Sequence, residues 1–341
     1  PSAMWSPSAL TPRQQAGQRV IYAYSGLTPP AALLDTIRNG EAAGVIFFGR
    51  NVSSNSQLKQ VAQQLNAAAQ ESPVTAPLLL MTDQEGGQIR RLSGAPEQSE
   101  KQIGASADPP GEASAAGTGA GQNLLSAGLN LNLAPVLDVY RHAGDFADQY
   151  GRSYSTTPGI CGSAGSHFVT AQQATGVAAT AKHFPGLGAA AADENTDAEP
   201  VTLNNSLSDI RNIDEAPYSA AIAAGIKLVM TSWAVYPALD PDRPAGLSST
   251  IVQGELRDRL GFTGVTITDA IGAGALNAFG ATGQRAVLAA EAGMDLILAS
   301  ASTGQGDDAV DGLTDALQSG QLDQAAFTAA VQRVTALRES L

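Results

Sequence analysis

Asp269 is the residue of this sequence whose position most directly suggests chemistry. It follows the run Val265-Thr266-Ile267-Thr268, which predicts a buried strand, and the small residues after it crowd it little. A carboxylate at such a strand end can attack an anomeric carbon and form a covalent glycosyl intermediate. The plainer interpretation is an Asp that caps the next helix, and the local stretch alone does not decide between the two.

Other polar residues follow apolar runs in the same way. They are Asp83, with Glu85, Arg90 and Arg91 beyond it; Asp138, with Arg152 in the following loop; the pair Lys182-His183; and Trp233. Carboxylates accept hydrogen bonds from adjacent hydroxyl groups, and Arg and Lys donate them, so together these residues would suit a hydroxyl-rich ligand. Plainer interpretations are a solvated pair for Arg90 and Arg91 and a hydrogen-bonded core histidine for His183.

Eight apolar, β-branched runs must position these residues, and helix-like stretches rich in Gly and Ala follow them. The expected strands are 19–24, 44–48, 77–82, 129–135, 177–182, 226–231, 264–268 and 294–299. The expected helices include 56–69, 112–127, 160–175, 214–224, 250–260 and 284–292, with two more in the tail, about 307–341, split near Gly320.

Alternating strands and helices are typical of parallel βαβ units. Eight units predict an α/β fold with a closed TIM-type (β/α)8 barrel, as a single domain over residues 1–341 with the tail helices packed outside it. The carboxyl ends of barrel strands meet at one mouth, where the polar residues are therefore expected to gather.

Six motifs in this order resemble the N-terminal barrel domain of glycoside hydrolase family 3, in its single-domain β-N-acetylglucosaminidase (NagZ-like) branch. They are GVIFFG at 44–49, DQEGGQIRRL at 83–92, LNLNLAPVLDV at 129–139, GRS at 151–153, KHFPG at 182–186 and ITD at 267–269. The resemblance implies a retaining exo-β-N-acetylhexosaminidase that removes terminal β-linked N-acetylglucosamine. It assigns the nucleophile to Asp269 and binding of the sugar hydroxyls to Asp83, Arg91, Arg152, Lys182 and His183.

One loop departs from the pattern of that family. Enzymes of this branch carry Gly-His-Gly and then Asp-Ser-His after the fifth strand, and the last His is their general acid/base. Here the loop reads GLGAAAADEN at 186–195, which puts Asn195 at that position. Asn cannot transfer a catalytic proton, and losing a general acid costs about 10²–10⁴ in rate.

Three explanations of this departure are open. Glu194 or Asp193 serves as a substitute acid, with Asp197 and Glu199 also close in sequence. Alternatively, the enzyme acts only on substrates with good leaving groups or transfers the sugar to an acceptor that needs little base help. The third is a catalytically impaired sugar-binding protein of the same fold. A Schiff-base aldolase that uses Lys182 is a further hypothesis from another class.

Composition limits the partners of the chain. The 19 Lys and Arg against 32 Asp and Glu give a net charge of −13, which argues against nucleic acid. No apolar run approaches the roughly 20 residues that span a bilayer. The lone Cys161 is expected to be a packing residue, three scattered His argue against a zinc site, and the chemistry proposed needs no cofactor.

The source of the substrate and the location of the protein are expected from weaker signals. The family implies N-acetylglucosamine-containing carbohydrate, with peptidoglycan fragments of the cell wall as one source, and the Ala- and Gly-rich composition suggests a bacterium. The start Pro1-Ser2-Ala3-Met4-Trp5 has neither an initiator Met nor a signal-like apolar segment, which fits a trimmed, exported chain in the cell envelope or outside the cell better than a cytoplasmic one. The oligomeric state stays open.

Overall fold

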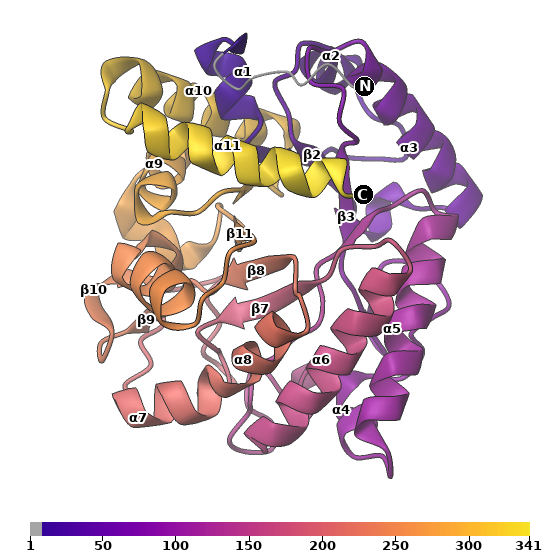
Figure 1. The fold of residues 1–341 in the computed structure, drawn as a ribbon, viewed down its shortest axis with the longest axis vertical. Helices are drawn as coiled ribbons and strands as arrows, with labels where there is room; N and C mark the ends of the chain where they lie inside the picture. Colours follow the sequence, from indigo (N-terminus) through magenta and orange to yellow (C-terminus); the bar gives the residue numbers. More distant parts are fainter. Residues whose placement is uncertain (1–8) are drawn as a thin grey trace.

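The computed structural model describes residues 9–341, and its parallel strands form two sheets (Figure 1). Pro1 to Trp5, on which the expectation about export depends, lie outside the described residues. One sheet has the order β12-β1-β2-β3-β6, with β1 (Val20–Tyr22), β2 (Gly44–Ile46), β3 (Leu79–Thr82), β6 (Leu131–Asn132) and β12 (Ile297–Leu298). The other has the order β11-β8-β7, with β7 (Thr180–Phe184), β8 (Leu228–Thr231) and β11 (Val265–Thr268).

Single parallel bridges connect the two sheets at both of their edges. Leu131 of β6 pairs with Ala178, just before β7, and Ile267 of β11 pairs with Leu296, just before β12. Every strand expected from the sequence is present, although most are shorter than the apolar runs that predicted them. Two antiparallel hairpins, β4 (Gln84–Gly86) with β5 (Ile89–Arg90) and β9 (Val235–Tyr236) with β10 (Asp240–Pro244), project beyond strands β3 and β8.

Helices lie outside the strands, and the α/β alternation expected from the sequence is confirmed. The longer ones are α2 (Ala31–Arg38), α3 (Asn55–Gln70), α5 (Pro109–Ser126), α6 (Pro158–Ala174), α8 (Ala216–Ala223), α9 (Thr282–Ala292), α10 (Thr303–Ser319) and α11 (Gln324–Glu339). The shorter ones are α1 (Pro12–Gly17), α4 (Glu100–Gly104), α7 (Leu207–Asp209) and the 3-10 helices η2 (Gly49–Asn51), η3 (Gln149–Gly151), η5 (Ala245–Leu247) and η7 (Gly274–Phe279). Two segments, η4 (Ile210–Asp214) and η6 (Thr250–Arg259), have π-helical hydrogen bonds, so the expected helix at 250–260 is present with a wider turn.

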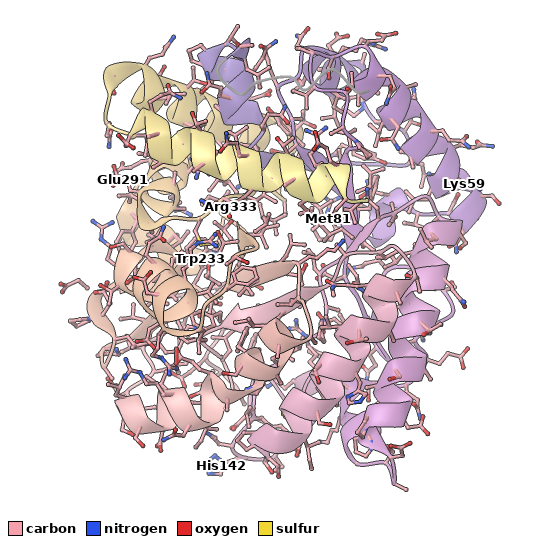
Figure 2. All side chains as sticks on the ribbon, viewed as in Figure 1. Lys59, Met81, His142, Trp233, Glu291 and Arg333 are labelled. Carbon is pink, nitrogen blue, oxygen red and sulfur yellow. The ribbon has the colours of Figure 1, made fainter. Side chains whose placement is uncertain are left out.

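One apolar cluster lies between the strands and draws on each parallel strand except β7, before which its member Ala178 lies. It contains Ile21, Ile46, Met81, Leu131, Ala178, Met230, Ile267 and Leu298. Figure 2 shows Met81 and Trp233 in the interior, whereas Lys59 and His142 point outward. Each fully buried side chain of this size contributes about 1.5–3 kcal/mol relative to exposure, so the strands have a shared core to pack against.

Helix α11 covers the N-terminal ends of the strands. Val334 and Leu337 join the apolar cluster, and the guanidinium of Arg338 donates to the carbonyls of Pro77 (2.7 Å) and Ala76 (2.9 Å), just before β3. The tail therefore consists of two helices that are divided at Gly320, as expected, and its second helix closes one end of the strands. Helix α11 leaves the opposite, C-terminal ends of the strands uncovered, so a functional site is expected there. Within residues 9–341 no helix is both long and apolar enough to cross a bilayer.

Candidate active site

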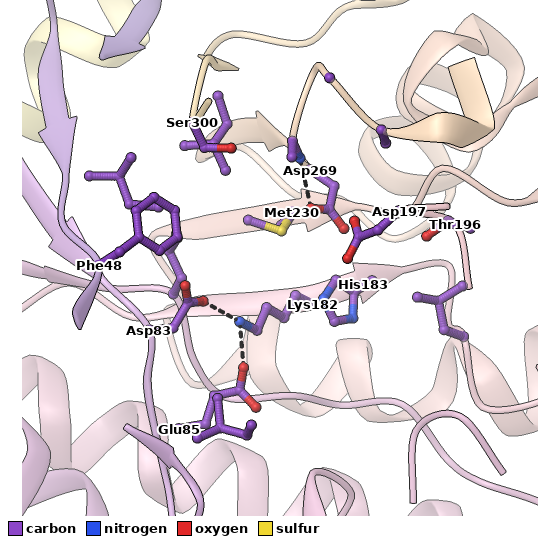
Figure 3. A pocket seen from close by; sticks show the side chains of 18 of the residues that line it. Phe48, Asp83, Glu85, Lys182, His183, Thr196, Asp197, Met230, Asp269 and Ser300 are labelled. Carbon is purple, nitrogen blue, oxygen red and sulfur yellow. Dashed lines mark hydrogen bonds and ion pairs between the residues drawn. The ribbon is translucent and has the colours of Figure 1, made fainter. Parts of the chain in front are cut away.

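A pocket of about 460 Å³ opens at the C-terminal ends of the strands (Figure 3). Six residues expected from the sequence line it, namely Asp83, Arg91, Arg152, Lys182, His183 and Asp269. Its floor is the apolar core, because Ile46, Leu133, Met230 and Leu298 belong to both the pocket wall and the core cluster. The pocket is thus polar around its sides and apolar at its base.

Lys182, on β7, is the centre of an ion-pair network. Its Nζ lies 2.8 Å from Asp83 Oδ1 and 2.8 Å from Glu85 Oε2, and its side chain is only 2 % exposed. Burial alone would lower the pKa of Lys182, but the two carboxylates outweigh burial and raise the pKa above its ordinary value. A Schiff-base lysine needs a neutral amine, so this network disfavours the aldolase hypothesis.

Glu85 holds the second cation of the network. Its two oxygens accept from Nε and Nη2 of Arg152, both at 2.9 Å, in a bidentate pair. Burial would raise the pKa of Glu85, but Arg152 and Lys182 together hold it below its ordinary value. Glu85 was expected among the polar residues near the strand ends, but no role of its own was predicted for it. The signal was its spacing of two from Asp83, since such residues share one face of an extended chain.

His183 is held in place by Asp138, which lies in the loop after β6. The Nδ1 of His183 lies 2.8 Å from Asp138 Oδ2, while Asp138 Oδ1 accepts the backbone N–H groups of His183 (3.1 Å) and Leu187 (2.9 Å). These contacts occupy one ring nitrogen and leave Nε2 as the ring nitrogen available to a ligand in the pocket. His183 is therefore an oriented pocket residue with its own carboxylate partner, and Asp138 is a further residue of the site.

Arg90 and Arg91 are not a solvated pair. Arg90 donates to the carbonyls of Gly87 (2.6 Å), in the turn between β4 and β5, and of Gly94, in the loop after β5, and so holds the two together. Arg91 lines the pocket, and its Nη2 lies 4.0 Å from Asp83 Oδ2. This ion pair is longer than those of Lys182 and Arg152, so the N–H groups of Arg91 can turn to a ligand.

Asp269 directly follows β11, and the helix-cap interpretation is wrong. The next helix, η7, starts at Gly274 with Ala273 at its N-cap position. Asp269 Oδ1 accepts the backbone N–H of Ala270 at 2.7 Å, while the indole N–H of Trp233 donates to the carbonyl of Ala270 at 2.9 Å. Trp233 therefore anchors the backbone that follows Asp269.

The loop after β7 presents a different carboxylate to the pocket from the two that the sequence favoured. Asp193 is exposed, and Glu194 accepts the backbone N–H of Ala191 at 2.9 Å; neither lines the pocket. Asn195 accepts the backbone N–H of Asp197 at 2.9 Å. Asp197 itself lines the pocket with Asp269, and Figure 3 shows the two carboxyl groups close together above His183.

Asp197 is exposed, as Asp193 is, but it lines the pocket, and its surroundings there raise its pKa. Desolvation by the pocket wall, and after it the negative charge of Asp269, raise the pKa of Asp197 above the ordinary value of an aspartate, although His183 and Arg152 act in the opposite direction. Two carboxyl groups in one pocket, one of them inclined to keep its proton, can supply a nucleophile and a proton donor. The sequence signal for Asp197 was Asn195, because an Asn two residues earlier commonly starts an Asx turn.

The other two histidines and the single cysteine do not line the pocket. The side chain of His142 is 86 % exposed, and His167 bonds to the carbonyl of Ser163 within α6. Cys161 is buried, as expected for a packing residue, and burial raises the pKa of its thiol to about 12. Within the described part of the chain, no group of three or more His, Cys, Asp or Glu is arranged to hold a metal ion.

Comparisons with known proteins agree with these features. The glycosyl hydrolase family 3 N terminal domain matches residues 20–337. A protein of Arthroderma benhamiae, named an uncharacterized secreted glycosyl hydrolase, is 48% identical over 96% of this chain and 93% of its own length. A protein of Stenotrophomonas maltophilia, named beta-hexosaminidase, is 34% identical over 77% of this chain and 78% of its own length.

Two solved structures are also similar. A family 3 beta-N-acetylglucosaminidase from Paenibacillus sp. has a TM-score of 0.92 and 34% identity; it is matched by 97% of this chain, which spans 62% of that longer chain. A beta-N-acetylhexosaminidase from Beutenbergia cavernae has a TM-score of 0.87 and 33% identity, with 96% of this chain and 98% of that chain matched. The similar proteins come from fungal and bacterial sources alike, so the expected bacterial origin of this chain stays a prediction.

Proposed function

The chain belongs to glycosyl hydrolase family 3, and from this premise we propose that it is a retaining, exo-acting β-N-acetylhexosaminidase. In this proposal it removes a terminal β-linked N-acetylglucosamine from its substrate, with fragments of cell-wall peptidoglycan as one source. The names of the hexosaminidase relatives support the sugar, and the apolar floor of the pocket supports exo action, because a blind pocket receives the end of a sugar chain. The secreted relative supports export.

The strands are proposed to form a closed (β/α)8 barrel that makes up a single domain over the chain. Parallel bridges at both edges of the two sheets support closure, and so does the apolar cluster to which residues of both sheets contribute. A barrel would explain why side chains from β3, β7 and β11 meet at one opening, since active sites of this fold lie at the C-terminal ends of the strands.

The sugar is proposed to be held by Asp83, Arg91, Arg152, Lys182 and His183. Asp83 accepts hydrogen bonds from adjacent hydroxyls, and the cations supply fixed donors. The ion pairs of Glu85 with Arg152 and Lys182 support this role, because they fix both cations before the ligand arrives and reduce the ordering that binding requires.

Asp269 is proposed as the nucleophile and Asp197 as the general acid/base. Asp269 attacks C1 of the sugar while Asp197 gives its proton to the glycosidic oxygen, so the C1–O bond breaks and the aglycone leaves as an alcohol. Asp197, now ionised, then takes a proton from water as that water attacks C1 and releases Asp269. The observation that carries this assignment is the place of Asp197 in the wall of the pocket that it shares with Asp269, and the raised pKa of Asp197 agrees with it.

In this proposal Asp197 takes the role that the sequence suggested for Glu194 or Asp193, because neither of those residues lines the pocket. Asn195 is the observation that favours the alternative function, a sugar-binding protein without turnover, because it stands where the family has its proton-transferring His. Asp197 supports the enzyme instead, since a second carboxyl group is available beside the nucleophile.

Hydrolysis of 4-nitrophenyl N-acetyl-β-D-glucosaminide tests the proposal. The protein is expected to release nitrophenol, the variant Asp269→Ala to lose this activity, and the control variant Asp193→Ala, altered at an exposed carboxylate of the same loop, to keep it. Binding of N-acetylglucosamine by calorimetry without turnover of any activated β-glycoside would instead establish the sugar-binding alternative.

A further inference from the structure

The segment that follows the proposed nucleophile is hydrogen-bonded to the segment that carries the proposed acid. The backbone N–H of Gly274 donates to the carbonyl of Asp197 at 2.7 Å, and that of Ala275 donates to the carbonyl of Thr196 at 3.0 Å. These bonds join two loops that follow different strands, β7 and β11. The position of the Asp197 backbone therefore depends on the segment 270–275.

Gly274 is required at this contact by the closeness of the two backbones. A Cβ atom at position 274 would lie 2.1 Å from the carbonyl oxygen of Ala198 and 2.4 Å from its carbonyl carbon. Both atoms belong to backbone and cannot swing aside, so any side chain at 274 would push the two loops apart.

Arg285, on α9, holds the segment 270–275 from its outer side. Its Nη1 donates to the carbonyls of Ile271 (3.1 Å) and Ala273 (3.3 Å), and its Nε donates to the carbonyl of Gly280 (2.8 Å). Arg285 does not line the pocket. It can therefore influence the site only through the backbone that it supports.

The N–H side of Asp197 is fixed within its own loop. Asn195 Oδ1 accepts that N–H at 2.9 Å, and the carbonyl of Asn195 accepts the N–H groups of Ala198 and Glu199, both at 3.1 Å. Both peptide groups that flank the Asp197 side chain are thus hydrogen-bonded, one by Asn195 and the other by Gly274. Only the side-chain torsions of Asp197 remain free to turn its carboxyl group.

The nucleophile is held by contacts on the strand side of this segment. Thr268, which precedes Asp269, donates its N–H to the carbonyl of Leu296 (3.0 Å), and its Oγ1 accepts the N–H of Leu298 (3.0 Å). The carboxylate of Asp269 accepts the N–H of Ala270, whose carbonyl is in turn held by Trp233. Loosening residues 271–275 would therefore move Asp197 more than Asp269.

We propose that Gly274, directly, and Arg285, through Ile271 and Ala273, are positioning residues that hold Asp197 opposite Asp269 before substrate binds. This inference rests on the proposed role of Asp197 as the general acid. Misplacing the acid weakens proton donation to the departing oxygen and leaves nucleophilic attack largely intact. Loss of either positioning residue should therefore harm substrates with poor leaving groups most.

The test is a leaving-group series with the variant Arg285→Gln. kcat/KM is measured for aryl N-acetyl-β-D-glucosaminides, from the 2,4-dinitrophenyl compound, which needs no acid, to the 4-methylphenyl compound, which does. We expect Arg285→Gln to lower the rate of the 4-methylphenyl compound at least about tenfold more than that of the dinitrophenyl compound. Gly274→Ala is expected to show the same pattern more strongly, and if it does not fold, Arg285→Gln carries the test.

Arg257→Gln is the control, because Arg257 also donates to two loop carbonyls, those of Phe262 and Gly264, before β11 and away from the pocket. Arg257 also pairs with the buried Asp295 at 2.9 Å, so this variant controls for a general loss of stability as well. It should change all substrates by one common factor. If Arg285→Gln also changes all substrates equally, or changes none, the positioning role is refuted. Asp197→Asn, run in the same series, separates the two proposals. If Asp197→Asn shows no leaving-group effect, the acid assignment fails and the inference fails with it. If Asp197→Asn shows the effect and Arg285→Gln does not, only the inference is overturned.

Discussion

Glu85 is expected to be essential for the stability of the pocket, and Glu85→Gln measures its contribution. The side chain of Glu85 is 2 % exposed and neutralises two cations, Arg152 and Lys182. After the substitution Lys182 keeps Asp83 at 2.8 Å, but Arg152 loses its bidentate partner and remains in the pocket wall. Breaking a buried ion pair from one side costs about 3–5 kcal/mol, and Gln keeps the shape of Glu, so this loss is one of charge and not of packing.

The assay is chemical and thermal unfolding of wild type and Glu85→Gln, followed by circular dichroism. We expect a loss of about 3–5 kcal/mol in the free energy of unfolding at pH 7 and a fall in Tm of roughly 6–10 °C. The pKa of Glu85 is lowered in the folded state, so its stabilisation is complete above its unfolded pKa and is lost as pH falls through the folded pKa. The gap between wild type and variant should therefore be full above about pH 5 and narrow below about pH 4.

Glu194→Gln is the control for this experiment, since Glu194 makes a single local bond to the backbone of Ala191. It should unfold within about 1 kcal/mol of wild type. If Glu85→Gln were also within about 1 kcal/mol of wild type at pH 7, the argument that Glu85 holds the two cations in place would be refuted.

Three other substitutions have defined outcomes. Asp197→Asn should lower kcat/KM for the 4-methylphenyl substrate by about 10²–10⁴ and remove the alkaline limb of its pH profile, because the raised-pKa acid that titrates there is gone; a limb that persists would assign it to another group. Asn195→His should lower kcat by roughly tenfold and not restore activity, because the turn that fixes the N–H of Asp197 is lost; a sharp gain in rate would contradict this. Burial and then Glu255 raise the pKa of Glu215 to about 8, so wild type should lose Tm relative to Glu215→Gln as pH rises from about 5 to about 8, with a constant difference above that, and parallel Tm curves across this range would disprove the coupling.

The strands could be predicted because their sequence patterns are local. The meeting of the pocket residues could be predicted because it follows from the order of the strands. The run Leu78-Leu79-Leu80-Met81 indicates a buried strand by itself, and β3 is found within it. Asp83, Lys182 and Asp269 could be expected in one place, although they lie far apart in sequence, because the carboxyl ends of parallel strands meet at one edge.

The choice among the carboxylates of this loop could not be made from the sequence, because it depends on a contact between distant loops. Asp193, Glu194 and Asp197 lie close together in sequence, and of the three only Asp197 lines the pocket, where Gly274 and Ala275 of another loop bond to the backbone at Asp197 and Thr196. The role of Asn195 could not be predicted from the sequence either. The sequence suggested a lost proton donor there, whereas its side chain orders the turn before Asp197.

The central claim is that Asp269 forms a covalent bond with the sugar, and mass spectrometry of the trapped enzyme tests it most directly. The protein is incubated with 5-fluoro-N-acetylglucosaminyl fluoride, digested and analysed for the peptide that carries the added sugar. One adduct is expected, on the peptide that contains Asp269, and no adduct in Asp269→Ala. An adduct on another carboxylate, or rapid turnover of the reagent by wild type without any covalent species, would contradict it.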